Sequence, residues 1–154
     1  MRRNEKAVTE LPDIEAILRA GKVCQLAFAD EPAPYIVNLN YGYHDGALYF
    51  HSAPEGRKME LIAGNPRAAF NIVIDLGIIE GGQACDWSCR YRSVVGHGRI
   101  RMIVGLEEKR RGLDIIMAQY TEGKFDYADK TVKSTAVYRL EIAAMTAKQS
   151  RTDS

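Results

Sequence analysis

The alternation over positions 35–43, with Tyr35, Val37, Leu39, Tyr41 and Tyr43 at every second position, is the feature that most constrains the fold of this chain. The apolar members share one face of an extended backbone, and the amides of Asn38 and Asn40 lie on the other. A period of two is typical of a strand with one buried face. Residues 44–46, His-Asp-Gly, are a hairpin turn signal, and residues 47–52 are predicted to return as the next strand. The pattern therefore predicts antiparallel pairing.

The rest of the chain adds strands and helices to this hairpin. The order of helix, three strands, helix, strands, helix and strand favours a mainly β, closed antiparallel barrel with helices at its ends over a doubly wound α/β sheet. We predict helices at 12–20, 56–63 and 106–120, further strands at 23–29, 67–75, 91–103 and 136–143, and a loop at 76–86.

Length and charge limit the possible functions. With 154 residues, the chain is predicted to form a single domain, residues 1–154, with a polar tail from about residue 150. A net charge of +1 leaves no excess of basic residues for a nucleic-acid partner. No apolar run approaches the roughly 18 residues of a membrane span, and the N-terminus lacks the apolar core of a secretory signal. We therefore expect a cytoplasmic protein with no membrane partner.

The cysteines and histidines do not predict a metal site. Cys85 and Cys89 are separated by three residues, but no second pair of cysteines or histidines completes a four-ligand set. The three histidines, His44, His51 and His97, are scattered along the chain. No structural metal is expected.

The stretch 49–58 carries the strongest chemical signal, because it runs from a strand through a Pro/Gly turn into a helix. The start of a helix offers unpaired N–H groups and the positive end of the helix dipole, and both attract phosphate. Arg57 would add a planar guanidinium and Lys58 a point charge, with the Ser52 hydroxyl nearby. The alternative is that Arg57 and Lys58 are ordinary solvated helix residues.

Several short motifs follow one another in order along the chain, and together they resemble one family. The runs 35–43, 48–53, 56–58 and 65–67 resemble the pyridoxamine 5'-phosphate oxidase-like flavoproteins. The later runs 84–88, 91–96 and 145–149 are similar to the Nim, or nitroimidazole-resistance, branch of that superfamily. The resemblance extends over about residues 2–149. Each motif alone is weak, whereas their ordered combination is fairly specific.

This resemblance implies a split β-barrel of the antiparallel, six-stranded Greek-key type. It also implies a homodimer with two flavin sites at the subunit interface, FMN as the cofactor with FAD as a possibility, and a small-molecule substrate. The strand 37–40 would lie against the flavin ring, and the loop around Trp87 would reach across the dimer. The cofactor-binding residues expected on this basis are Val37, Asn38, Leu39, Asn40, Phe50, His51, Ser52, Arg57, Lys58, Trp87 and Ser93.

Several of these assignments have a simpler structural alternative. Asn38 and Asn40 could be solvated strand residues. Ser93 could be a hydroxyl inside the barrel, and Trp87 could be part of the core of a dimer interface, where aromatic residues are common. The sequence alone leaves these alternatives open.

The resemblance favours a flavin-dependent reductase of nitroaromatic compounds, with His51 as a candidate proton donor. Pyridoxamine phosphate oxidase activity is not expected, because no tryptophan follows Trp87 to form that family's C-terminal substrate clamp. No nicotinamide-binding motif is visible, so the sequence does not identify an electron donor. Two alternatives are a non-catalytic flavin-binding protein and a haem-binding or haem-degrading barrel, in which His51 or His97 would ligate iron.

Overall fold

Long antiparallel strands form the framework of the protein. The computed structural model describes residues 4–150, so the predicted polar tail lies outside the described residues. The strands are β1 (Ala7–Val8), β2 (Cys24–Phe28), β3 (Tyr35–Leu39), β4 (Gly42–His44), β5 (Ala47–Ser52), β6 (Arg67–Ile79), β7 (Ser88–Ile103) and β8 (Ala136–Gln149). The helices are α1 (Leu11–Ala20), α2 (Arg57–Gly64), α3 (Leu106–Ala118) and α4 (Asp129–Ser134), with 3₁₀ turns η1 (Asn4–Lys6) and η2 (Ala84–Asp86).

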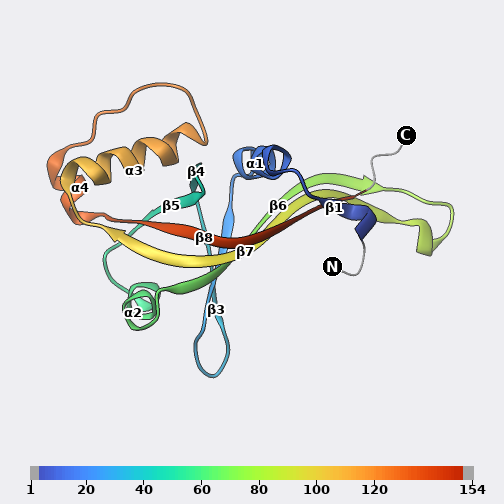
Figure 1. The fold of residues 1–154 in the computed structure, drawn as a ribbon, viewed down its shortest axis with the longest axis horizontal. Helices are drawn as coiled ribbons and strands as arrows, with labels where there is room; N and C mark the ends of the chain where they lie inside the picture. The colour runs from blue at the N-terminus through green and yellow to red at the C-terminus, as the bar shows by residue number, and fades with distance from the viewer. Residues whose placement is uncertain (1–3, 151–154) are drawn as a thin grey trace.

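All of these strands pair in one sheet. Their order is β3-β2-β6-β7-β8-β5-β4, and β1 pairs with β8. The edge strands β3 and β4 are joined only by Asn40 and Tyr41, so the sheet curls back on itself into a split barrel (Figure 1). The predicted mainly β, antiparallel class is confirmed, with eight strands in place of six. One added strand arises because the pattern over 35–43 breaks into β3 and β4.

Alternate side chains of the strands fill the barrel. Phe50, Ile72 and Leu140 come from three different strands and have no exposed surface. Val37 packs against the same cluster, whereas Asn38 is exposed, which confirms the two faces predicted for β3. Full burial of an apolar side chain of this size stabilises the fold by about 1.5–3 kcal/mol. The functional residues of the strands must therefore lie on the outer face or at strand ends.

One side chain joins the ends of α1 and α3. The Gln119 amide donates hydrogen bonds to the carbonyls of Leu18, Arg19 and Gly21 at 2.9, 2.9 and 2.7 Å. These carbonyls lie at the C-terminus of α1, where the helix itself offers no donor.

Within residues 4–150, none of the helices is both long and apolar enough to cross a bilayer.

Helix α3 covers part of the outer face of the sheet. The side chain of Val137 in β8 points to the outer face of the sheet. It has no exposed surface, because Gly112 of α3 lies against it. Gly42 of β4 lies equally close to α3, and a side chain there would begin 2.3 Å from the carbonyl oxygen of Ile115. The outer face is thus divided into a covered part under α3 and an open part over β2, β6 and β7.

The hairpin of β6 and β7 is longer than predicted. Strand β6 does not end at Asp75 but continues to Ile79, which pairs with Ser88. Gly77, with φ of 100°, accommodates a bulge, and its N–H donates to the Asp75 carboxylate at 2.8 Å. The glycines that suggested a loop therefore lie at a bulge and at the tip. In Figure 1 this hairpin, which carries η2, extends away from the rest of the barrel.

Two further elements differ from the prediction. Strand β8 continues beyond Ala143 to Gln149, and its register against β7 shifts between His97 and Gly98. Such a shift reverses the alternation of faces, so a period of two does not reveal the whole strand. The sequence also does not predict α4, because a six-residue polar helix with one buried side chain, Val132, has too little periodicity.

Candidate functional site

The N-terminus of α2 is an open helix end. Gly56 precedes it with φ of 103°, and apart from its chain neighbours no atom of the described residues lies within 4 Å of the position where a side chain at Gly56 would begin. Among residues 4–150, no side chain caps the first N–H groups of α2. The short turn from Ser52 brings this helix end close to the end of β5. Free N–H groups and the helix dipole together favour an anion here.

The Arg57 guanidinium at this helix end is engaged by carboxylates. Its Nε donates to Asp30 at 2.9 Å, a second N–H donates to the other Asp30 oxygen, and Nη1 donates to Glu60 at 3.3 Å. Arg57 holds the pKa of Asp30 below its usual value, so this carboxylate is ionised at neutral pH. The bidentate geometry predicted for a phosphate is thus occupied by Asp30, a contact that sequence reasoning missed.

Lys58 and His51 form the other half of the site. Lys58 is half-buried, its burial lowers its pKa, and no carboxylate within residues 4–150 forms an ion pair with it. His51 lies on the outer face of β5, where partial loss of hydration and the charge of Lys58 lower its pKa below 6.5. A partly desolvated cation without an acidic partner favours binding of an external anion.

Phe50 and Ser52 lie on the opposite side of β5 from His51. Phe50 is fully buried and stacks on Tyr138 of β8, with ring centroids 5.7 Å apart. Only the main chain of Phe50 is therefore available to a cofactor. Ser52 is half-buried at the strand end, where its hydroxyl donates to the Ala53 carbonyl at 2.9 Å. Ser52 is thus next to the α2 helix end, as expected.

The predicted ring-binding strand, β3, offers one free amide. Val37 and Leu39 turn their side chains toward the core, which leaves their main chains for a ligand. The Asn40 amide donates to the Tyr120 hydroxyl at 3.2 Å, so this side chain helps to anchor the end of α3. Asn38 is exposed on the outer face, where it is paired with Gln25 of β2. Of the two predicted amides, Asn38 is the better placed to bind a ligand.

The structure does not bring Trp87 and Ser93 to the α2 site of the same chain. Trp87 is 53% exposed near the tip of the β6–β7 hairpin, and Ser93 is half-buried on the outer face of β7. In Figure 1 this hairpin and α2 lie toward opposite ends of the molecule. The residues gathered at one site are therefore His51, Ser52, Arg57 and Lys58.

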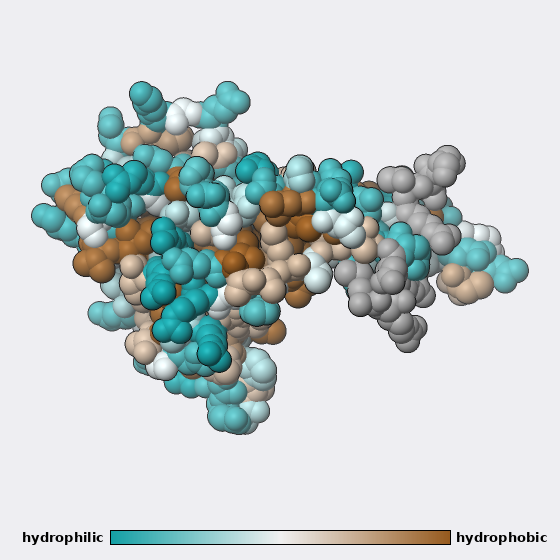
Figure 2. Space-filling model, in the orientation of Figure 1, coloured by the Kyte–Doolittle hydropathy of each residue, from teal (hydrophilic) through white to brown (hydrophobic). Residues whose placement is uncertain are grey.

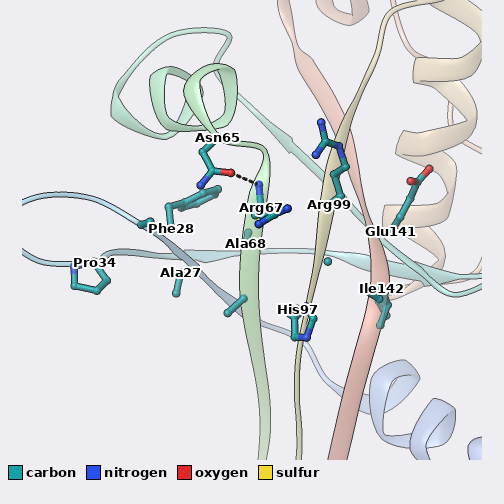
Figure 3. Close-up of a pocket in the computed structure, with 14 residues that line it drawn as sticks. Ala27, Phe28, Pro34, Asn65, Arg67, Ala68, His97, Arg99, Glu141 and Ile142 are labelled. Atoms are coloured by element: carbon teal, nitrogen blue, oxygen red, sulfur yellow. Dashed lines mark hydrogen bonds between the residues drawn. The ribbon is translucent and has the colours of Figure 1, made fainter.

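A separate open cavity of about 810 Å³ lies on the outer face (Figure 3). Its wall includes Ala27 and Ala69, which pair across β2 and β6, and Ala69 pairs in turn with His97 of β7. Arg67 and Arg99 line the same cavity and are cross-strand partners. Sequence reasoning considered His97 but missed this cavity, because four separate strands contribute to it. The one signal of this cavity in the sequence is the presence of small residues at strand positions whose side chains face outward.

Apolar side chains are also exposed on the outer face of β3, β6 and β7. The side chains of Ile36, Val73 and Val95 point to the outer face and are 63%, 51% and 50% exposed, respectively. Figure 2 shows apolar residues among polar ones along the middle of one face of the molecule. Exposed apolar surface of this kind often marks an interaction site.

No cluster suited to a metal ion was found in the part of the chain that the structure describes, residues 4–150. Cys85 and Cys89 are exposed free thiols of the β6–β7 hairpin, and Cys24 is a buried one in β2. Burial raises the pKa of the Cys24 thiol to about 12, so it behaves as a small apolar core residue.

The fold and the helix end define a class: split-barrel proteins in which helix α2 begins directly after the end of a barrel strand, without a side-chain cap among the described residues. A sequence profile described as pyridoxamine 5'-phosphate oxidase matches residues 10–149. The chain belongs to the pyridoxamine 5'-phosphate oxidase family, as its ordered motifs predict. No curated protein sequence matches the chain significantly.

Solved structures support this assignment. A candidate 5-nitroimidazole antibiotic resistance protein from Bacteroides thetaiotaomicron is 35% identical, with a TM-score of 0.82, over 93% of this chain and 86% of that one. A flavocytochrome from Azotobacter vinelandii is 20% identical with a TM-score of 0.86, over 99% of this chain and 72% of that one. An FAD- and haem-binding protein from Mycobacterium smegmatis is 20% identical with a TM-score of 0.86, over 96% and 74%. The last two establish only a shared fold.

Proposed function

We propose that this protein binds a flavin, FMN in the first instance, and acts as a reductase of nitroimidazoles and related nitroaromatic molecules. The 35% identical relative is described as a nitroimidazole resistance protein, and two further neighbours are named for flavin or haem cofactors. The observation that carries the proposal is the uncapped start of α2 beside a half-buried Lys58 that has no acidic partner within residues 4–150.

The residues present fit a flavin phosphate. The phosphate would bind to the first N–H groups of α2, the Lys58 ammonium and the Ser52 hydroxyl, with Arg57 beside them. Open space at Gly56 leaves room for the group. The main chain of β3 and the Asn38 amide would orient the polar edge of the ring. The bound flavin itself would supply the electron transfer that nitro reduction requires.

A homodimer would complete such a site. The β6–β7 hairpin, which carries Trp87 and Ser93, lies toward the opposite end of the molecule from α2 (Figure 1), whereas a second copy could bring its own hairpin to this α2. The exposed apolar residues Ile36, Val73 and Val95 offer a surface for that contact. Sedimentation of the purified protein at several concentrations would test the dimer.

His51 is the proposed proton donor to the substrate, which gives a specific kinetic prediction. Its pKa is lowered below 6.5, so the protonated fraction is small at pH 7 and increases as the pH falls. The wild-type rate of nitro reduction should therefore rise below neutral pH. We expect His51→Gln to reduce the rate by about 100-fold, as for loss of a general acid, and to remove this rise.

Steady-state reduction of a nitroimidazole, measured from pH 5 to pH 8 with each nicotinamide donor, tests this role. His44→Gln is the matched control, because His44 is an exposed histidine of β4. Equal rates and pH profiles for His51→Gln and wild type would eliminate His51 as the donor. Flavin-loaded protein with no turnover under any condition would instead favour the non-catalytic flavin-binding alternative.

Haem binding is a second candidate function, favoured by the cavity at His97. The cavity combines a histidine with a wall of small apolar residues, and Arg67 and Arg99 could pair with the propionates of haem (Figure 3). Haem titration should then produce a Soret band that is lost in His97→Ala and retained in His44→Ala. Absence of any Soret band in the wild type would remove this candidate.

A further inference from the structure

We propose that Asp30 is an internal competitor for the flavin phosphate, which can bind the Nε side of Arg57 only by displacing the Asp30 carboxylate. This inference rests on the proposed flavin site. It assigns to a residue of the β2–β3 loop the control of how tightly the phosphate is held. Asp30 is 27 residues from Arg57 in the sequence, and the tertiary fold brings the two side chains into contact.

The geometry of the contact is the geometry that a phosphate would need. Nε and one terminal nitrogen of Arg57 donate to the two oxygens of Asp30, with the Nε contact at 2.9 Å. Arginine binds carboxylates and phosphates through this same side-on pair of N–H groups. Both acceptors therefore compete for one side of the guanidinium.

Burial and charge strengthen the competition. The Asp30 side chain is only 13% exposed, against 51% for Arg57, so solvent screens this pair less than an ordinary surface pair. Glu60 accepts a further hydrogen bond from Arg57 at 3.3 Å. Together, Arg57, Lys58, Asp30 and Glu60 carry two positive and two negative charges. A phosphate dianion would therefore gain little net attraction while Asp30 remains in place.

The loop that carries Asp30 can release it without opening the core. Asp30 lies two residues beyond the end of β2, and its Oδ1 also accepts the Glu31 N–H at 2.9 Å. Residues 31–34, which complete the connection to β3, are all exposed. Exchange of the carboxylate for a phosphate would then involve a surface loop rather than buried strands.

The test compares FMN with riboflavin, which carries the same ring but no phosphate. We expect Asp30→Asn to bind FMN about fivefold more tightly, equivalent to about 1 kcal/mol, with unchanged riboflavin affinity. The gain should vanish in an Arg57→Ala background. Glu31→Gln, which removes the adjacent charge without touching Arg57, is the matched control, and circular dichroism verifies that each variant is folded.

Each outcome of these fluorescence titrations is decisive. Unchanged or weaker FMN binding by Asp30→Asn overturns the proposal, and weaker binding would identify Asp30 as a residue that orients Arg57. Equal affinities for FMN and riboflavin in both proteins would overturn it together with the phosphate site, while flavin binding itself stands. Failure of both proteins to bind either flavin would overturn the proposed function and this inference with it.

Discussion

Replacement of both Arg57 and Lys58 by alanine is expected to weaken FMN binding by about 100-fold. Each cation would contribute a charge-assisted hydrogen bond worth about 1.5–3 kcal/mol, and every 1.4 kcal/mol is a factor of ten. Because Asp30 already engages Arg57, Lys58 should account for the larger share. Riboflavin affinity should not change. Fluorescence titration with both ligands measures the two effects.

A control variant removes the same two charges elsewhere. Arg111→Ala with Lys130→Ala deletes exposed cations of α3 and α4 and should leave FMN affinity unchanged. Both double variants should remain folded, because Arg57 is exposed and Lys58 is only half-buried. Retention of wild-type FMN affinity by the Arg57/Lys58 variant would rule out a phosphate site at the start of α2.

Gly42→Ala is expected to lower the free energy of unfolding by about 3 kcal/mol, at the upper end of the usual effect of overpacking. The new Cβ would lie 2.3 Å from the Ile115 carbonyl oxygen and 2.8 Å from the Ile116 Cα. Both atoms belong to the backbone of α3, so no change of rotamer relieves the contact. For a chain of this length, the midpoint of thermal unfolding should fall by about 6–12 °C.

Gly64→Ala is the matched control for Gly42→Ala. Gly64 is the last residue of α2 and has no atom within 4 Å of the position of an added Cβ. Alanine there should leave the free energy of unfolding unchanged or raise it slightly, because alanine favours helix more than glycine does. Urea denaturation monitored by circular dichroism gives both values. Equal stabilities of the two variants would show that α3 does not lie against β4 as described.

Several elements could be predicted because their signals are local. The period of two over β3 places Val37 inward and Asn38 outward, and both positions agree with the structure. The helix predicted at 12–20 is present as α1, with Ile14, Ile17 and Leu18 buried on one face. The failures lie where a bulge changes the period, as in β6 at Gly77 and in β8 opposite His97.

The candidate site was predictable only in part. The strand–turn–helix pattern around 49–58 places Ser52, Arg57 and Lys58 together, because residues this close in a short turn cannot separate. The Arg57–Asp30 pair and the cavity around His97 depend on strands and loops far apart in the sequence. No local pattern contains such contacts.

The sequence by itself therefore determined the family, the antiparallel class and the helix end at residues 56–58, since each depends on local periodicity or on ordered motifs. The tertiary structure decided which side of Arg57 is occupied by Asp30, which amide of β3 remains available, and how far the β6–β7 hairpin extends from α2. These features depend on strand register and curvature, which bring together residues that the chain separates.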